Sequence, residues 1–127
     1  MEVLSSRVIV RPVDLERSLR FYGEALGLAV YREYGEGRSR GVVFFLGGGF
    51  LELTSRAPAP DVDKVSLWLQ VRDLDATHRA LAAAGVEIVA APERKPWGLE
   101  EMWIRDPDGL SIAVVEVPED HPLRRRL

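Results

Sequence analysis

The chain has no cysteine among its 127 residues. A chain without thiols forms no disulfide, offers no thiolate to a metal and has no cysteine nucleophile. Histidine is almost as scarce, with only His78 and His121. Borderline divalent metals prefer several imidazole or carboxylate ligands. The composition therefore supplies little material for a metal centre of that kind.

Charge of one sign and long apolar runs are also missing. Seventeen basic and 20 acidic residues leave a net charge of −3, which argues against a nucleic-acid partner. No apolar run approaches the roughly 18 to 20 residues of a membrane span, and the segment 1–10 lacks a signal pattern. We therefore expect a cytoplasmic protein with no membrane partner. Its hydrophobic content of 46% is enough for the core of one domain.

The most informative feature that is present is a weak internal repeat. A shift of 59 positions, from 14 to 73, places Asp14 on Asp73 and aligns similar residues after each. In both copies a short apolar stretch leads into this aspartate, which can cap a helix that begins just after it. Gly27 and Gly85 then mark the expected helix ends. The repeated unit is therefore a strand, a cap and an amphipathic helix.

Further strand-like stretches follow each predicted helix. They lie at 28–34, 41–47 and 50–55 in the first half, and at 86–92, 101–106 and 110–117 in the second. Each half is thus predicted to be a β-α-β-β-β module, which gives an α+β fold. We expect a single domain, 1–127, divided into a first module at about 5–55, a connector at 56–64, a second module at about 65–118 and a tail at 119–127.

Four stretches together resemble the vicinal oxygen chelate superfamily, which includes glyoxalase I, extradiol dioxygenases, and fosfomycin- and bleomycin-resistance proteins. They are residues 13–28, 50–53, 71–75 and 96–109, so that the resemblance spans nearly the whole chain. It implies two β-α-β-β-β modules whose curled mixed sheets form a cup, with the helices outside. It also implies a homodimer.

Most enzymes of this superfamily hold a divalent metal in the cup, and the resemblance places its ligand positions on Arg7, Glu52, Ser66 and Ala113. Only Glu52 is a usual ligand. A guanidinium has no lone pair to offer and would repel a cation. We therefore expect no metal and no other cofactor. Arg7 and Glu52 are instead predicted to form an ion pair or to share a bound anion.

No other constellation in the sequence predicts catalysis, and we assign no catalytic residue. His78 lies within the second predicted helix, where packing or partial exposure is the simplest interpretation. His121 and the three arginines at 124–126 belong to the tail, which we expect to be solvated. The glycines at 47–49 precede a strand rather than a helix, so they indicate a hairpin turn and not a phosphate-binding loop.

Strand alternation predicts the lining of the cup. The candidate ligand-binding residues are Arg7, Phe50, Glu52, Ser66, Trp68, Trp97 and Trp103. All three tryptophans belong to the second module, and ordinary core packing is the alternative for each. The strand phase at Trp103 stays open. We expect the tryptophans to border one concave site, with Phe50 and Glu52 on its opposite wall.

Three functions fit this pattern. An aromatic-lined concavity suits a planar or amphipathic organic ligand, so the leading hypothesis is a metal-free protein that binds and sequesters a small organic molecule. The second is a lyase, isomerase or dioxygenase of the same superfamily that uses Glu52. The third is a dimerising module whose cup is filled by its own side chains. The sequence does not identify the ligand.

Overall fold

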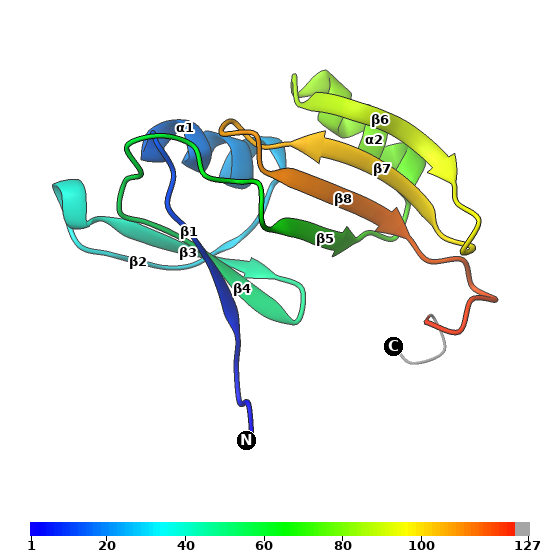
Figure 1. Cartoon of the computed structure of the whole chain (residues 1–127), viewed down its shortest axis with the longest axis horizontal. Coiled ribbons are helices and arrows are strands. Elements are labelled where there is room, and N and C mark those ends of the chain that lie inside the picture. Colours follow the sequence, from blue (N-terminus) through cyan, green and yellow to red (C-terminus); the bar gives the residue numbers. More distant parts are fainter. Residues whose placement is uncertain (124–127) are drawn as a thin grey trace. The chain divides into compact units, whose positions relative to one another are not determined.

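The computed structural model describes residues 1–123, so the arginines of the predicted basic tail lie outside the described part. The chain forms two compact units, Met1–Asp61 and a second that begins at Val62 (Figure 1). The boundary between them falls inside the predicted connector at 56–64.

The first unit is a four-stranded mixed sheet with one helical segment. Its elements are β1 (Arg7–Val10), α1 (Leu15–Leu19), the π-helical continuation η1 (Arg20–Ala25), β2 (Val30–Tyr34), the 3₁₀ turn η2 (Gly37–Ser39), β3 (Gly41–Leu46) and β4 (Gly49–Thr54). The strand order is β1-β4-β3-β2, with β1 parallel to β4 and the other pairs antiparallel. A tight turn at Gly47 and Gly48 joins β3 to β4, which confirms the predicted hairpin.

The second unit repeats this topology. Its elements are β5 (Ser66–Gln70), α2 (Leu74–Ala83), β6 (Glu87–Arg94), β7 (Glu100–Arg105) and β8 (Ser111–Glu116). The strand order is β5-β8-β7-β6, again with the first strand parallel to the last and the other pairs antiparallel. The α+β class and the two β-α-β-β-β modules are therefore confirmed. That the two sheets form one cup stays a prediction.

Both helices begin where the repeat predicts. Asp14 and Asp73 are extended, and their side chains accept hydrogen bonds from the backbone N–H groups of Arg17 and Ala76, respectively. Each carboxylate thus satisfies an N–H group that has no partner within its helix. Gly27 and Gly85 have φ values of 71° and 79°, a left-handed conformation that glycine adopts readily at helix ends.

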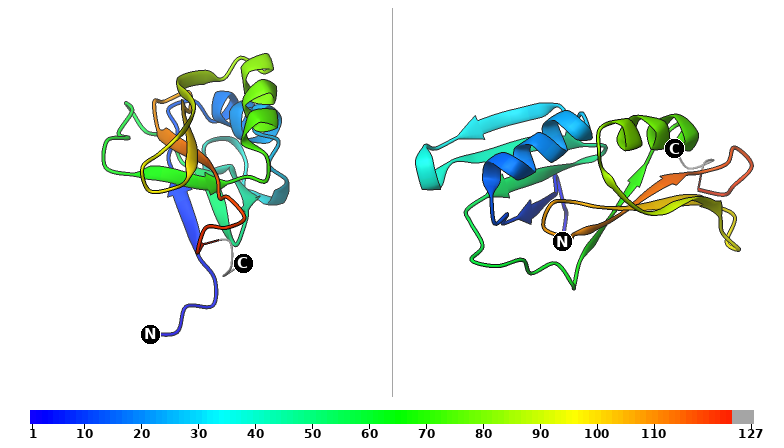
Figure 2. Two further views of the ribbon diagram at one scale, coloured as in Figure 1. Left: turned by 90° about the vertical axis from the view of Figure 1, so that its right-hand side faces the viewer. Right: turned by 90° about the horizontal axis from the view of Figure 1, so that it is seen from above.

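Each sheet packs its helix on one face and leaves the other face without a helix (Figure 2). Side chains that alternate along the strands form the helix-covered core. They are Val42, Phe44, Leu51 and Leu53 in the first unit, and Met102, Ile104, Ile112 and Val114 in the second, all buried. Residues of the opposite parity therefore lie on the second face, called here the helix-free face. No helix within residues 1–123 is long and apolar enough to cross a membrane.

Candidate functional site

Glu52 is the centre of a polar cluster on the helix-free face of the first unit. Its side chain is only 12% exposed, and the Arg7 guanidinium donates a hydrogen bond to Oε1 at 2.6 Å. The Tyr34 hydroxyl donates to the second carboxylate oxygen, Oε2, also at 2.6 Å. The predicted ion pair between Arg7 and Glu52 is therefore confirmed. Tyr34 adds a second hydrogen bond, to the carboxylate oxygen that Arg7 does not contact.

Strand register brings Arg7 to Glu52. Strands β1 and β4 are parallel, with Arg7 opposite Phe50 and Ile9 opposite Glu52. Residues two apart on a strand share a face, so Arg7 lies diagonally beside Glu52 on the helix-free side. The guanidinium has only a short distance to span between adjacent strands.

Tyr34 reaches the same carboxylate from β2, although β3 lies between β2 and β4. Gly41 of β3 pairs directly with Tyr34. A Cβ atom at this glycine would collide with the phenol ring, so the ring occupies the space of the missing side chain. The absence of a side chain at Gly41 therefore lets Tyr34 lie across β3 and bring its hydroxyl to Glu52.

The two hydrogen bonds set the charge of the cluster. The Tyr34 hydroxyl, followed by the Arg7 guanidinium, lowers the pKa of Glu52 against a smaller opposing effect of burial. The hydrogen bond to Glu52 is in turn the main cause that raises the pKa of Tyr34. At neutral pH the cluster thus combines an ionised glutamate, a charged arginine and a neutral tyrosine whose hydroxyl donates a hydrogen bond to the carboxylate.

Three aromatic rings beside this cluster form what we call the aromatic patch: Tyr31, Phe45 and Phe50. The ring centroid of Tyr31 is 5.1 Å from that of Phe45 and 4.8 Å from that of Phe50. A β-bulge between Val30 and Arg32 shifts the register here and lets Tyr31 join the other rings. Tyr31 and Phe45 remain 50% and 46% exposed, which leaves a large aromatic surface open to a ligand.

Arg7 connects the aromatic patch to the polar cluster. Its guanidinium carbon lies 5.8 Å from the ring centroid of Phe50, within cation–π range, while the same group binds Glu52. Phe50, Glu52 and Arg7, three of the residues predicted to bind a ligand, are therefore neighbours on one face.

The second unit places Trp68 and Trp103 in one row on its helix-free face. Ala113 of β8 pairs with Trp68 on one side and with Trp103 on the other. This register settles the strand phase that the sequence left open for Trp103. Trp103 packs against a buried apolar cluster of Leu99, Ala113, Val115 and Val117, whereas Trp68 is 50% exposed.

The indole of Trp97 is hydrogen-bonded to Glu101, a residue of β7 on the same face. The Trp97 Nε1–H group donates to Oε2 of the buried Glu101 at 2.6 Å, and the His121 ring lies 3.2 Å from the Trp97 carbonyl oxygen. Ser66, the remaining candidate, is exposed on β5. The four candidates of the second unit thus occupy or border its helix-free face. That they and Glu52 line one concavity stays a prediction.

A model of the Glyoxalase/Bleomycin resistance protein/Dioxygenase superfamily matches residues 5–114 of this chain. The chain belongs to this superfamily. A relative from Vibrio cholerae serotype O1, named as a probable lactoylglutathione lyase, is 26% identical over 124 residues, which cover 89% of this chain and 90% of that protein. The resemblance carried by the sequence motifs is therefore confirmed.

Two solved structures share the fold. A superfamily member from Sphaerobacter thermophilus has a TM-score of 0.71 and 25% identity, with 91% of this chain and 98% of that one covered. TnmS3 from a Streptomyces species, described as an antibiotic binding protein, has a TM-score of 0.78 and 24% identity, with 92% and 98% covered.

The residues at the metal-ligand positions of the superfamily do not fit a divalent metal here. Arg7 is a cation without a lone pair, and both oxygens of Glu52 already accept hydrogen bonds. Ser66 and Ala113 add no usual ligand. Among residues 1–123, no group of three or more histidine, aspartate or glutamate side chains could hold a metal.

Sequence reasoning missed Tyr34, Tyr31 and Phe45. Both stretches, "YREY" and "GVVFF", are rich in aromatic residues, but regular alternation would put Tyr31 and Tyr34 on opposite faces because they are three positions apart. Two structural features place these residues and have no signal in the sequence. One is the bulge that brings Tyr31 onto the helix-free face, and the other is the missing side chain at Gly41, which leaves space for the Tyr34 ring. Both depend on how β2 pairs with β3.

Proposed function

We propose that this protein binds a small organic molecule without a divalent metal, and that the helix-free face of the first unit forms part of the site. The observation that carries the proposal is that both carboxylate oxygens of Glu52 are already hydrogen-bonded. Its carboxylate, at a metal-ligand position of the superfamily, is held by Arg7 and Tyr34. The Arg7 guanidinium supplies at this position the positive charge that a metal ion would otherwise provide.

The aromatic patch supports the same proposal. Ligand sites are commonly apolar and aromatic, with a few polar groups that fix orientation, and the patch lies directly beside such a polar group. The antibiotic binding protein TnmS3 has the same fold, which supports sequestration of an organic compound as the role of this chain. We also retain the proposals that Ser66 and the three tryptophans contribute to the site and that the protein is a cytoplasmic homodimer.

The test combines metal analysis with a ligand screen. Protein purified without chelator should contain far less than one equivalent of zinc, nickel, manganese or iron by mass spectrometry. A calorimetric screen of planar aromatic compounds should yield binders whose affinity is unchanged by EDTA. A stoichiometric metal coordinated by Glu52 would contradict the metal-free proposal.

A second candidate function is a lyase, which the name of the Vibrio cholerae relative favours. Formation of lactoylglutathione by the original protein when a divalent metal is added, and its loss in Glu52→Gln under the same conditions, would support it. If no planar compound binds and no such activity is found, the dimerising module with a filled cup becomes the best description. Size-exclusion chromatography with light scattering then tests the dimer.

A further inference from the structure

We infer that the ligand of the helix-free face in the first unit is a planar aromatic anion, with its ring on the aromatic patch and its acid group against Arg32. This inference rests on the proposed function and narrows it to a ligand class. It follows from one side chain that the sequence did not single out and from the charges around it.

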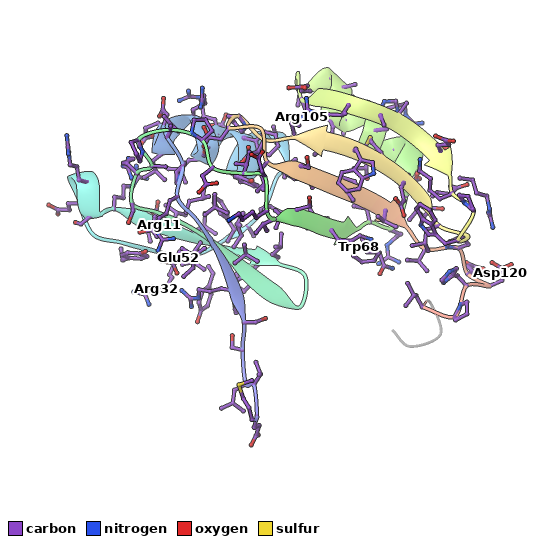
Figure 3. All side chains as sticks on the ribbon, in the orientation of Figure 1. Arg11, Arg32, Glu52, Trp68, Arg105 and Asp120 are labelled. Atoms are coloured by element: carbon purple, nitrogen blue, oxygen red, sulfur yellow. The ribbon has the colours of Figure 1, made fainter. Side chains whose placement is uncertain are left out.

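Arg32 is an exposed cation of this face without an ion-pair partner among residues 1–123. It pairs with Val43 of β3, which pairs in turn with Glu52, so Arg32 lies in the same row across the sheet. Its side chain is exposed, and Figure 3 shows it on the first unit with Glu52. Its guanidinium carbon lies 5.5 Å from the centroid of the Tyr34 ring, and its charge also contributes a little to the lowered pKa of Glu52.

The acidic groups near Arg32 are already engaged. Glu52 is bound to Arg7 at 2.6 Å, so that this pair contributes no net charge. Glu33, the next residue in β2, has the opposite strand parity and is bound to Arg40 at 3.1 Å. Arg40 also holds Glu16 at 2.7 Å. No carboxylate of the described residues forms an ion pair with Arg32.

The position of Arg32 beside the aromatic patch determines the shape of the ligand. Tyr31 precedes Arg32 in the chain, and both reach the helix-free face at the bulge. The planes of Tyr31 and Phe45 meet at 66°, so a flat ring would stack on one of them and contact the edge of the other. In that position an acid group attached to the ring would lie towards the guanidinium. Arginine binds carboxylates through two parallel hydrogen bonds, whereas it repels a cationic ligand. An aromatic carboxylate satisfies both surfaces at once.

Three naphthalenes of nearly equal shape test this inference by calorimetry at pH 7. They are 2-naphthoate, which is an anion, 2-naphthamide, which is neutral, and 2-(aminomethyl)naphthalene, which is a cation. We expect the anion to bind about fivefold more tightly than the amide, as one exposed charge contact allows. The cation should bind most weakly. Added salt should reduce the advantage of the anion and leave amide binding unchanged.

Matched variants assign the effect to residues. In Arg32→Gln the anion should lose its advantage while the affinity for the amide stays the same. Arg79→Gln removes the same charge from the exposed surface of α2 and should leave the advantage intact. Phe45→Ala should weaken the binding of both anion and amide, because it removes part of the aromatic surface. Circular dichroism confirms that each variant is folded.

The outcomes separate this inference from the function on which it rests. Equal binding of anion and amide, both weakened by Phe45→Ala, would overturn the anion preference and leave small-molecule binding in place. An advantage that persists in Arg32→Gln would overturn the role of Arg32. If no naphthalene binds and the wider screen of planar compounds also fails, the proposed site itself is wrong.

Discussion

Glu52 is the one residue of a usual ligand type at the metal-ligand positions that the resemblance implies. Its carboxylate faces the interior of a polar cluster, but its partners are a guanidinium and a phenol. Both donate hydrogen bonds, so they stabilise the charged form of the carboxylate. The energetic consequences can be measured with and without any ligand.

The first prediction concerns pH. Because the folded-state pKa of Glu52 is lowered, first by Tyr34 and then by Arg7, the cluster stabilises the protein fully above the ordinary glutamate pKa of about 4.3. This stability is lost as the pH falls through the lower folded-state value. Urea unfolding of the original protein and of Glu52→Gln should therefore show a stability difference that shrinks on acidification. A difference independent of pH would contradict it.

The second prediction is a double-mutant cycle on the ion pair. Arg7→Met leaves the largely buried carboxylate without its cation and should cost about 1–3 kcal/mol, between the values for exposed and buried pairs. Glu52→Gln in the same background should recover part of that loss, because no charge is then left unpaired. Urea unfolding of all four proteins gives the coupling. Purely additive losses would mean that the pair does not interact in solution.

At the scale of the elements, the contact between β2 and β4 depends on a glycine in the strand between them. The third prediction is that Gly41→Ala displaces the Tyr34 ring, breaks its hydrogen bond to Glu52 and lowers the unfolding free energy by about 1–3 kcal/mol. Gly48→Ala is the matched control, since a Cβ there meets no atom within 4 Å and the backbone is unstrained. Equal losses of unfolding free energy in the two variants would contradict the prediction, because they would mean that the Tyr34 ring can move aside without cost.

The fourth prediction compares two tryptophans in one row of the second sheet. Trp103→Ala should be the more destabilising change, by about 2–4 kcal/mol, because its ring covers the apolar cluster around Ala113. Trp68→Ala should cost much less, because half of that side chain is already exposed. Thermal unfolding of both variants decides this. A larger loss for Trp68 would assign it to the core.

The sequence predicted these elements well where the signal is local. Asp14 and Asp73 cap helices, and Gly27 and Gly85 end them, because caps depend on only a few neighbouring residues. It also predicted the contact of Arg7 with Glu52. That prediction came from the family pattern, since residues 45 positions apart have no local signal.

The remaining part of the candidate site depends on pairing between strands. The bulge near Tyr31 and the space above Gly41 appear only when β2 is aligned with β3. The hydrogen bond from Trp97 to Glu101 likewise depends on the loop before β7 folding back over its own strand. Strand alternation alone gives the face of a residue but not the neighbour that it meets there.

At the scale of the whole molecule, the fifth prediction is that a chelator leaves the melting temperature unchanged. A protein that needs a bound metal loses the binding free energy of that metal when EDTA removes it. Arg7, Ser66 and Ala113, at the metal-ligand positions that the resemblance implies, are not usual metal ligands, so we expect no metal-binding free energy to be lost. Differential scanning calorimetry with and without EDTA measures it, with an added excess of zinc as the reverse control. A clear drop in melting temperature with EDTA would contradict the prediction.

The same topology in both units has a consequence for how this chain can vary. In the second unit Ala113, Val115 and Trp103 use the helix-free face for a second apolar cluster, so most substitutions there also reduce folding stability. In the first unit Tyr31, Arg32 and Phe45 are exposed, so changes there cost little stability and would alter the recognition proposed above. If the proposed site is correct, descendants of this sequence would acquire new ligands through one copy of the duplicated unit while the other copy changes slowly.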